Sequence, residues 1–213
     1  MDFKESFRGI RSAYMELFHD VDLDEPSFST AMYFIIFNPT FWNIAARLEY
    51  HTHFLTKLTG SAKKGCYLLA ATIFTLGVGR DLCFHKALDA QPLSPVLDNP
   101  TVKLVGQALV VAGQVLVGTS MWQLGITGTY LGDYFGILMD HIVTSFPFNV
   151  CNNPMYQGST LSFLGYSLVT GKAAGLILAF MVYAMYSFAL RFEEPFTAKI
   201  YAERDNARSR KNE

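Results

Sequence analysis

Long runs of apolar residues restrict the possible folds of this chain more than any other feature. They lie at residues 28–46, 65–84, 102–124 and 173–190. Hydrophobic residues make up 51% of the 213 residues and charged residues 16%, against about 25% charged residues in a typical soluble domain. A run of roughly 20 apolar residues is long enough to cross a bilayer as a helix. The sequence therefore predicts an all-α integral membrane protein, a bundle of about four to five membrane helices.

Charge and cysteine content narrow the expected partners. The net charge of −1 provides no overall positive field, so we expect no nucleic-acid partner. Cys66, Cys83 and Cys151 are odd in number and unrelated in spacing, which predicts neither a disulfide framework nor a zinc site, and we expect no metal. No apolar core precedes Met32, so we expect no cleavable signal peptide. Instead, residues 3–18 have the spacing of an amphipathic helix, lying on a membrane surface or against the body of the protein.

We interpret the whole chain, 1–213, as one domain whose parts differ in composition. An amphipathic segment at 1–27 precedes three membrane helices within 28–124. A segment at 125–204 begins with many glycine, aromatic and polar residues and contains most of the candidate functional residues, and a polar tail follows at 205–213.

Lysine and arginine predict the orientation, because they gather on the cytosolic side of membrane proteins. They are frequent in the loop after the first run and in the tail, whereas the loop between the second and third runs holds mainly Lys86. The C-terminus is therefore expected in the cytosol. Gly171 is a natural helix stop, so we predict that residues 154–190 form a helical hairpin that turns there. This hairpin would bring the segment before it to the cytosolic face.

Proline and glycine predict local details inside these segments. Pro39 is expected to kink or split the first helix, which then either spans the membrane or enters it halfway. Gly128, Gly132 and Gly136 are spaced by four, which would leave one helix face bare. A bare face favours close helix packing, or it gives a ligand access to the backbone.

Two adjacent carboxylates, Glu193 and Glu194, follow the last apolar run. Ionisable side chains at the bilayer edge are rare without a partner, so the pair indicates a functional site, and a cation is the simplest partner. Asn153 and Pro154 are typical of a helix start with asparagine as the N-cap. The free backbone N–H groups of such a start can hold a carboxylate, although an ordinary capped helix explains the same residues.

These motifs resemble those of the phospholipid methyltransferases, small membrane enzymes that convert phosphatidylethanolamine derivatives to phosphatidylcholine. The resemblance includes Asn153-Pro154-x-Tyr156-x-Gly158, Arg191-x-Glu193-Glu194-Pro195 and the string 131–138, and it extends to residues 37–47. Isoprenylcysteine carboxyl methyltransferases, a related family, share the Pro-x-Tyr-x-Gly and Glu-Glu patterns. The resemblance spans nearly the whole chain and is strongest to the fungal members, which perform the last two methylations.

The resemblance implies S-adenosylmethionine as cofactor, in a pocket at the cytosolic face. The substrates would be phosphatidyl-N-methylethanolamine and phosphatidyl-N,N-dimethylethanolamine within the membrane, and methylation of phosphatidylethanolamine itself stays open. The implied location is the endoplasmic reticulum membrane, with the mitochondrial membrane as a further candidate. The sequence predicts neither the oligomeric state nor the acyl-chain preference.

Cofactor-binding residues follow from the same motifs. The sulfonium and ammonium of the cofactor need anionic partners, which Glu193 and Glu194 supply, and its carboxylate needs donors near the helix start at Asn153, Pro154 and Tyr156. The family also assigns cofactor binding to a Gly-x-Gly in the third helix. That motif aligns with Val111-Ala112-Gly113, where only Gly113 matches, and a lone glycine in a membrane helix also fits helix packing.

Methyl transfer requires the amine lone pair to lie in line with the sulfonium methyl group. The alkylammonium must lose a proton first, and Asp133, His141 and Glu194 are the candidate acceptors, with Asp140 as a further possibility. Tyr130, Tyr134 and Phe135 are candidate substrate-binding residues, because aromatic rings attract cations. They also fit the aromatic belt of an ordinary membrane protein.

Two other functions remain as alternatives. A prenylcysteine carboxyl methyltransferase acts on an anion and would favour basic residues in its pocket, which the central segment before Lys172 lacks. A membrane scaffold or transporter without catalysis is the second alternative, although no inverted repeat is evident.

Overall fold

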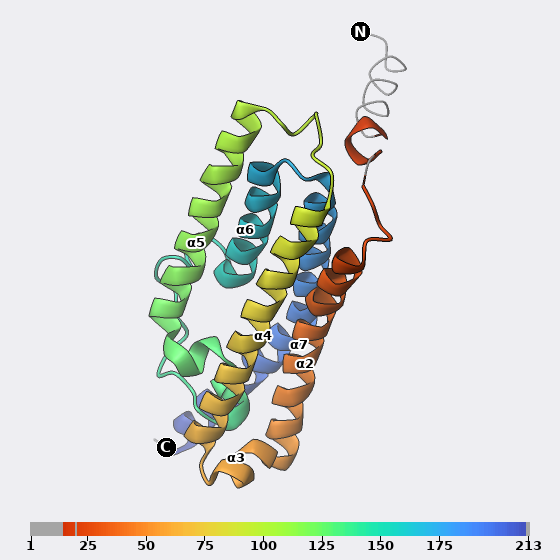
Figure 1. Cartoon of the computed structure of the whole chain (residues 1–213). Helices are drawn as coiled ribbons and strands as arrows, with labels where there is room; N and C mark the ends of the chain where they lie inside the picture. Colours follow the sequence, from red (N-terminus) through yellow and green to blue (C-terminus); the bar gives the residue numbers. More distant parts are fainter. Residues whose placement is uncertain (1–14, 20, 212–213) are drawn as a thin grey trace.

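The structure is a computed structural model that describes residues 15–19 and 21–211 (Figure 1). The described part of the chain is a bundle of helices without strands, which confirms the predicted all-α class. Its elements are α2 (Pro26–Thr52), α3 (Phe54–Thr59), α4 (Ala62–Ala90), α5 (Pro100–Thr129), the 3₁₀-helix η1 (Gly132–Phe135), α6 (Pro154–Thr170) and α7 (Ala173–Lys211). The amphipathic pattern predicted at 3–18 lies mostly outside the described residues.

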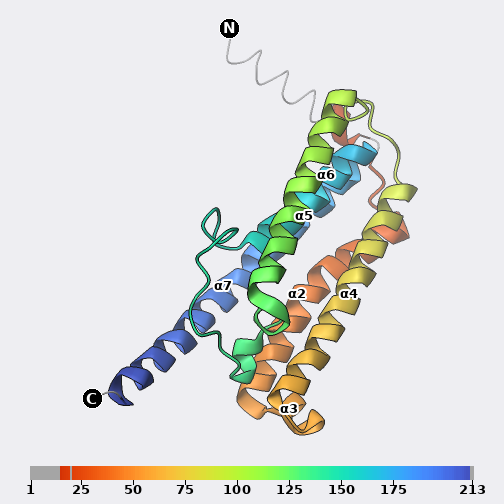
Figure 2. The same cartoon turned by 90° about the vertical axis from the view of Figure 1, so that its left-hand side faces the viewer.

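Three of the described helical segments are long and apolar enough to cross a membrane, namely Ala62–Ala90, Pro100–Phe135 and Ala173–Arg210. Three of the four predicted runs lie within these segments, in α4, α5 and α7, whereas the first, 28–46, lies within α2. α6 has 17 residues, short of the roughly 20 that a full span needs. It packs between α5 and α7 (Figures 1 and 2).

α2 is one helix of 27 residues that runs through Pro39, so the expected split at this proline is wrong. Pro39 has no N–H for the carbonyl of the preceding turn, and side-chain hydrogen bonds surround this position. The buried Asn38 donates its Nδ2 to the Leu76 carbonyl of α4 at 2.9 Å. One turn later, Asn43 Nδ2 donates to the Pro39 carbonyl at 3.1 Å. Tertiary contacts therefore maintain a helix that local propensity would interrupt.

α5 and α6 make the most intimate contact in the bundle, and glycines lie at its centre. A Cβ atom added at Gly113 would lie 2.4 Å from the Gly158 carbonyl oxygen, and one added at Gly106 would lie 2.7 Å from that of Gly165. The two glycines of each helix are about two turns apart, so they lie on one face. Only residues without a side chain allow the backbones to approach this closely.

The predicted C-terminal hairpin is confirmed. α6 ends at Gly171, which has the left-handed φ of 68°, and α7 begins two residues later. Gly171 N–H donates to the Leu168 carbonyl at 3.2 Å, and Lys172 N–H donates to the Ser167 carbonyl at 3.1 Å. The chain thus closes the end of α6 with the backbone bonds that a glycine stop provides.

The expected bare helix face at Gly128, Gly132 and Gly136 is wrong. Gly125 leaves the helical conformation with a φ of 62°, and Gly136 has a φ of 73° after the short η1. Gly128 therefore lies in the last turn of α5, Gly132 in η1 and Gly136 directly after it, rather than along one helix. An added Cβ at Gly132 would lie 2.6 Å from the Thr127 carbonyl oxygen, so this glycine permits a tight backbone turn.

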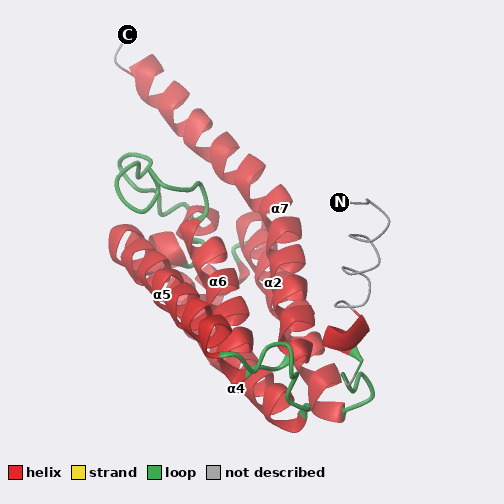
Figure 3. Ribbon diagram, turned by 90° about the horizontal axis from the view of Figure 1, so that it is seen from above, coloured by secondary structure: helices red, strands yellow, loops and turns green. Residues whose placement is uncertain are grey.

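The two ends of the bundle differ in composition. α3 and the C-terminus lie at one end, together with the basic loop and tail, while the α4–α5 loop and the Gly171 turn lie at the other (Figure 1). Ser94 N–H joins the loop to this turn by donating to the Gly171 carbonyl at 2.9 Å. Beyond the bundle, the C-terminal part of α7 projects away from the other helices (Figures 2 and 3).

The glycine contact predicts a difference between two alanine substitutions on α5. Gly113→Ala forces a methyl group against the α6 backbone, and we expect a loss of about 1–3 kcal/mol and a lower thermal midpoint in detergent. Gly118→Ala is the matched control, because an added Cβ there meets nothing within 4 Å. Equal midpoints for both variants would show that the α5–α6 contact is not as close as described.

Candidate functional site

A cavity of about 910 Å³ lies between α4, α5 and α7, with the start of α6 and the loop before it on the remaining side. This volume lies within the range of about 300–1,000 Å³ that is usual for small-molecule sites. Its wall has an apolar part, formed by residues of α4 and α5 such as Phe74, Val78, Val117 and Met121. The polar part comes from η1, α6, α7, the loop at 136–153 and two charged residues of α4.

Glu193 has a buried side chain that joins three helices. Its Oε1 accepts hydrogen bonds from Trp42 Nε1 and Asn43 Nδ2 of α2, both at 2.8 Å. Its Oε2 accepts a hydrogen bond from the Tyr156 hydroxyl of α6 at 2.6 Å. A buried carboxylate needs such donors to compensate for lost hydration. Glu193 therefore fixes the positions of α2 and α6 against α7 while it lines the cavity.

Glu194 differs from its neighbour because it is exposed and lines the same cavity. One of its oxygens, Oε1, accepts a hydrogen bond from Asn153 Nδ2 at 2.7 Å. Asn153 is the N-cap of α6, as predicted, but its side chain makes no capping bond to the helix. The first N–H groups of α6, around Tyr156, thus have no side-chain cap. An acidic side chain and a helix start lie together at one part of the wall.

Asp133 is the third predicted acidic residue that lines the cavity. It belongs to η1, and the Thr197 hydroxyl of α7 donates to its Oδ2 at 2.7 Å. Its Oδ1 accepts a hydrogen bond from the Tyr134 backbone N–H at 3.1 Å. The folded chain therefore brings Asp133, Glu193 and Glu194 to one cavity, although Asp133 and Glu193 are 60 positions apart in the sequence.

The aromatic wall contains two of the predicted aromatic residues, Tyr130 and Tyr156, together with residues that were not predicted. Tyr130 lines the cavity, but Tyr134 and Phe135 are buried elsewhere, and the Tyr134 ring stacks on Phe196 at 3.9 Å. The cavity is also lined by the rings of Trp42, Tyr156 and Tyr186, with centroids 4.8 to 6.4 Å apart. These rings come from α2, α6 and α7, so no local sequence pattern predicts that they lie together.

Several predicted residues lie away from the cavity. Val111 and Ala112 are exposed on α5, and Gly113 is buried in the contact with α6. His141 is exposed in the loop after η1 and does not line the cavity. Pro154 does line it, at the start of α6. The structure therefore gathers the acidic pair, Asp133 and the α6 start, but neither the third-helix motif nor His141.

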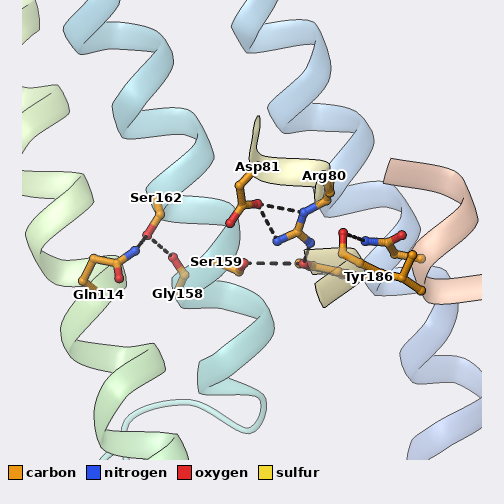
Figure 4. Close-up of polar contacts among 9 residues, drawn as sticks. Arg80, Asp81, Gln114, Gly158, Ser159, Ser162 and Tyr186 are labelled. Carbon is orange, nitrogen blue, oxygen red and sulfur yellow. Dashed lines mark hydrogen bonds and ion pairs between the residues drawn. The ribbon is translucent and has the colours of Figure 1, made fainter. Parts of the chain in front are cut away.

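An ion pair in α4 was missed from the sequence. Arg80 Nε and Nη2 donate to Asp81 Oδ1 at 3.0 and 2.9 Å, and Arg80 Nη1 donates to the Tyr186 hydroxyl (Figure 4). Both residues line the cavity, and Arg80 is 8% exposed. The predicted run 65–84 includes both residues, but the sequence assigned them no role; α4 continues to Ala90. The available signal was the presence of two charged residues inside an apolar run.

The charges at the wall determine what the cavity can bind. Among the described residues that line it, four are carboxylates and one is a guanidinium: Asp81, Asp133, Glu193, Glu194 and Arg80. Excess negative charge in a partly apolar cavity favours a cationic ligand. Exposed faces of aromatic rings add to this attraction. The arrangement suits a small organic cation that also has apolar parts.

Comparison with known proteins gives a consistent assignment. Residues 102–204 match the family model described as phospholipid methyltransferase. The chain is 58% identical over 199 residues to phosphatidyl-N-methylethanolamine N-methyltransferase of Saccharomyces cerevisiae, covering 93% of this chain and 97% of that protein. It is 46% identical over 184 residues to phosphatidylethanolamine N-methyltransferase of Homo sapiens, covering 86% of this chain and 92% of that protein. No solved structure matches the chain.

The two adjacent glutamates are predicted to differ in their effect on stability. Glu193→Gln replaces one of the two acceptor oxygens by a donor, so at least one buried donor loses its partner, at a cost of about 1–3 kcal/mol. Glu194→Gln changes an exposed group, and we expect an effect within about 0.5 kcal/mol. The thermal midpoints of the two ligand-free variants in detergent, compared with that of the unaltered protein, measure both changes in stability. Equal midpoints would contradict the central role of Glu193.

Proposed function

This chain belongs to the phospholipid methyltransferase family, and we propose that it methylates phosphatidyl-N-methylethanolamine and phosphatidyl-N,N-dimethylethanolamine, forming phosphatidylcholine. Relatives named for methylation of the monomethyl lipid, 53 to 58% identical, support this substrate. The observation that carries the proposal is the cavity, because its acidic and aromatic wall suits both a cationic cofactor and a lipid amine. The prenylcysteine alternative is disfavoured, since an anionic substrate fits this wall poorly.

S-adenosylmethionine is the proposed cofactor, and it would supply an electrophilic methyl group on a sulfonium. The chain offers a partner for each of its charges. Glu194 uses one oxygen for Asn153, and its other oxygen can accept from the cofactor ammonium. The uncapped start of α6 can donate backbone N–H groups to the cofactor carboxylate. Glu193 holds Tyr156 and Trp42 in place, so that their rings border the cationic centre.

Asp133 is the proposed proton acceptor. Its carboxylate lines the cavity between the Thr197 hydroxyl and the Tyr134 N–H, which fix its orientation. A positioned carboxylate can take a proton from the substrate ammonium, which frees the nitrogen lone pair for attack. Tyr130 lies at the same wall and is proposed to contact the lipid headgroup. Glu194 is assigned to the cofactor instead, and His141 lies outside the cavity.

We further propose the endoplasmic reticulum membrane as the location, with the C-terminus in the cytosol. The support for this orientation is the concentration of basic residues at one end of the bundle, where α3 and the tail of α7 lie (Figure 1). Basic residues favour the cytosolic side, and the cytosol is the source of a soluble methyl donor.

A direct assay tests the activity. The purified full chain receives S-adenosylmethionine labelled in its methyl group, together with the unmethylated, monomethyl and dimethyl lipids in parallel and a prenylcysteine substrate. We expect label in the monomethyl and dimethyl lipids. Transfer to prenylcysteine alone, or to no lipid at all, would contradict the proposed function.

Glu194→Gln is predicted to weaken cofactor binding. Loss of a charged acceptor for the ammonium should raise the dissociation constant of S-adenosylhomocysteine about 10- to 100-fold, measured by calorimetry. Glu203→Gln is the control, because this residue lies on the same helix in an exposed pair with Lys199 at 3.7 Å. An unchanged constant for Glu194→Gln would remove this residue from the cofactor site.

Asp133→Asn is predicted to lower kcat by roughly 100-fold or more, because an amide cannot accept the substrate proton. Its rate should also lose the acidic limb of the pH profile, since the titrating group is gone. His141→Gln should keep a rate near that of the unaltered protein. The opposite ranking of the two variants would identify the histidine as the acceptor.

A further inference from the structure

Arg80 is the one lysine or arginine among the described residues that line the cavity. It lies in the membrane-crossing α4, ten residues before its end, or about 15 Å along the helix. Figure 4 shows its guanidinium pointing from α4 towards Tyr186 of α7, with Ser159 of α6 beside it. A charged residue at such depth indicates a function unless packing explains it.

Packing does not require this charge. Neighbouring residues on a helix do not face each other, so the pair of Arg80 with Asp81 depends on both side chains turning towards the cavity. An apolar pair of similar size would fill the space at a lower desolvation cost. Asp81 keeps 51% of its side chain exposed, so it balances the charge of Arg80 without enclosing it.

The guanidinium is held in a fixed orientation. Asp81 accepts from its Nε and Nη2, the Tyr186 hydroxyl accepts from Nη1, and the Phe163 ring centroid lies 4.8 Å from its Cζ. A guanidinium has more N–H donors than these contacts use. Its planar fork is suited to the two oxygens of a phosphate or carboxylate. Arg80 is thus a preorganised anion site in a cavity whose other charged groups are acidic.

We propose that Arg80 binds the phosphodiester of the lipid headgroup, an assignment that rests on the proposed methylation of a phospholipid. The four carboxylates of the wall repel this phosphate, and Arg80 is the charged group that can offset them. The apolar residues of α4 and α5 near it, including Val78 and Val117, suit the acyl chains. The contact of α5 with α4 is much less extensive than its contact with α6. We therefore infer that a lipid enters from the membrane between α4 and α5.

The position of Arg80 also orients the amine. Its partner Tyr186 lies 4.8 Å, ring to ring, from Tyr156, whose hydroxyl donates to Glu193 at 2.6 Å. A phosphate at Arg80 therefore places the ethanolamine nitrogen, two carbons beyond the phosphate oxygen, along these aromatic rings. Rings of this kind attract an alkylammonium. The phosphate site thus determines which part of the headgroup reaches the cofactor-binding side of the cavity.

The cofactor carboxylate has the same anion chemistry, so the test must distinguish the two ligands. Arg80→Gln, Arg80→Lys and the double variant Arg80→Gln/Asp81→Asn, which leaves no unpaired charge, are assayed in the full chain. Lys103→Gln is the control, because it removes a basic residue from an exposed pair with Asp98 at the far end of α5. Each variant receives the monomethyl phospholipid and a phosphorus-free diacyl analogue with the same terminal methylamine.

For the phospholipid, we expect KM to rise about 10- to 100-fold in Arg80→Gln and the double variant, and less in Arg80→Lys. For the phosphorus-free analogue, KM should stay within about twofold, since no phosphate contact is lost. The dissociation constant of S-adenosylhomocysteine should stay unchanged. A purely structural role of Arg80 would impair both substrates equally.

Three results would overturn the assignment: equal KM changes for both substrates, an unchanged KM for the phospholipid, or weaker S-adenosylhomocysteine binding in the double variant. The last would assign Arg80 to the cofactor carboxylate instead. The unaltered chain tests the proposed function separately. If that function is right, the unaltered chain binds S-adenosylhomocysteine and methylates the monomethyl lipid, whatever the role of Arg80.

Discussion

Three hydrogen bonds to the buried carboxylate of Glu193 determine how the bundle and its cavity are arranged. They join α2, through Trp42 and Asn43, and α6, through Tyr156, to α7. These donors engage both oxygens of Glu193, so its carboxylate positions two helices against a third. Glu194, one residue later, is exposed to the cavity, with one oxygen bonded to Asn153. Both glutamates line the cavity, but the side chain of Glu193 is buried and holds helices together, whereas that of Glu194 is exposed.

The close contact of α5 with α6 has a second consequence for the cavity. Paired glycines bring α5 and α6 together. α4 has few contacts with α5, and apolar residues of α4 and α5 line the cavity. Gly113, the one matching residue of the expected third-helix motif, belongs to this contact. Its influence on the cavity therefore acts through the position of α6, whose first turn contains Pro154 and Tyr156.

The sequence predicted the parts that local chemistry controls. Apolar runs predicted the helices, Gly171 predicted the hairpin turn, and the adjacent glutamates pointed to the cavity wall. It failed where distant contacts decide. α2 continues through Pro39, where Asn38 bonds to α4. The glycines at 128–136 do not share one helix, because Gly125 has a positive φ and the short η1 follows α5. Partners more than 100 residues apart, such as Trp42 with Glu193, leave no periodic signal in one sequence.

The same limit applies to the charged residues of the cavity. Arg80 lies within the apolar run 65–84, and the sequence assigned it no role because its partner Tyr186 is 106 positions away in α7. The folded chain shows that acidic groups and one arginine share a single wall. This arrangement suits the two proposed ligands, a cofactor with a positive sulfonium and a lipid with a negative phosphodiester.

A structure of the full chain with bound S-adenosylhomocysteine and the monomethyl phospholipid tests this account most directly. It should show the cofactor amino group within hydrogen-bond distance of Glu194, and the lipid headgroup in the same cavity between α4, α5 and α7. A cofactor product bound at the exposed face of α5 near Val111, with the cavity empty, would contradict the account.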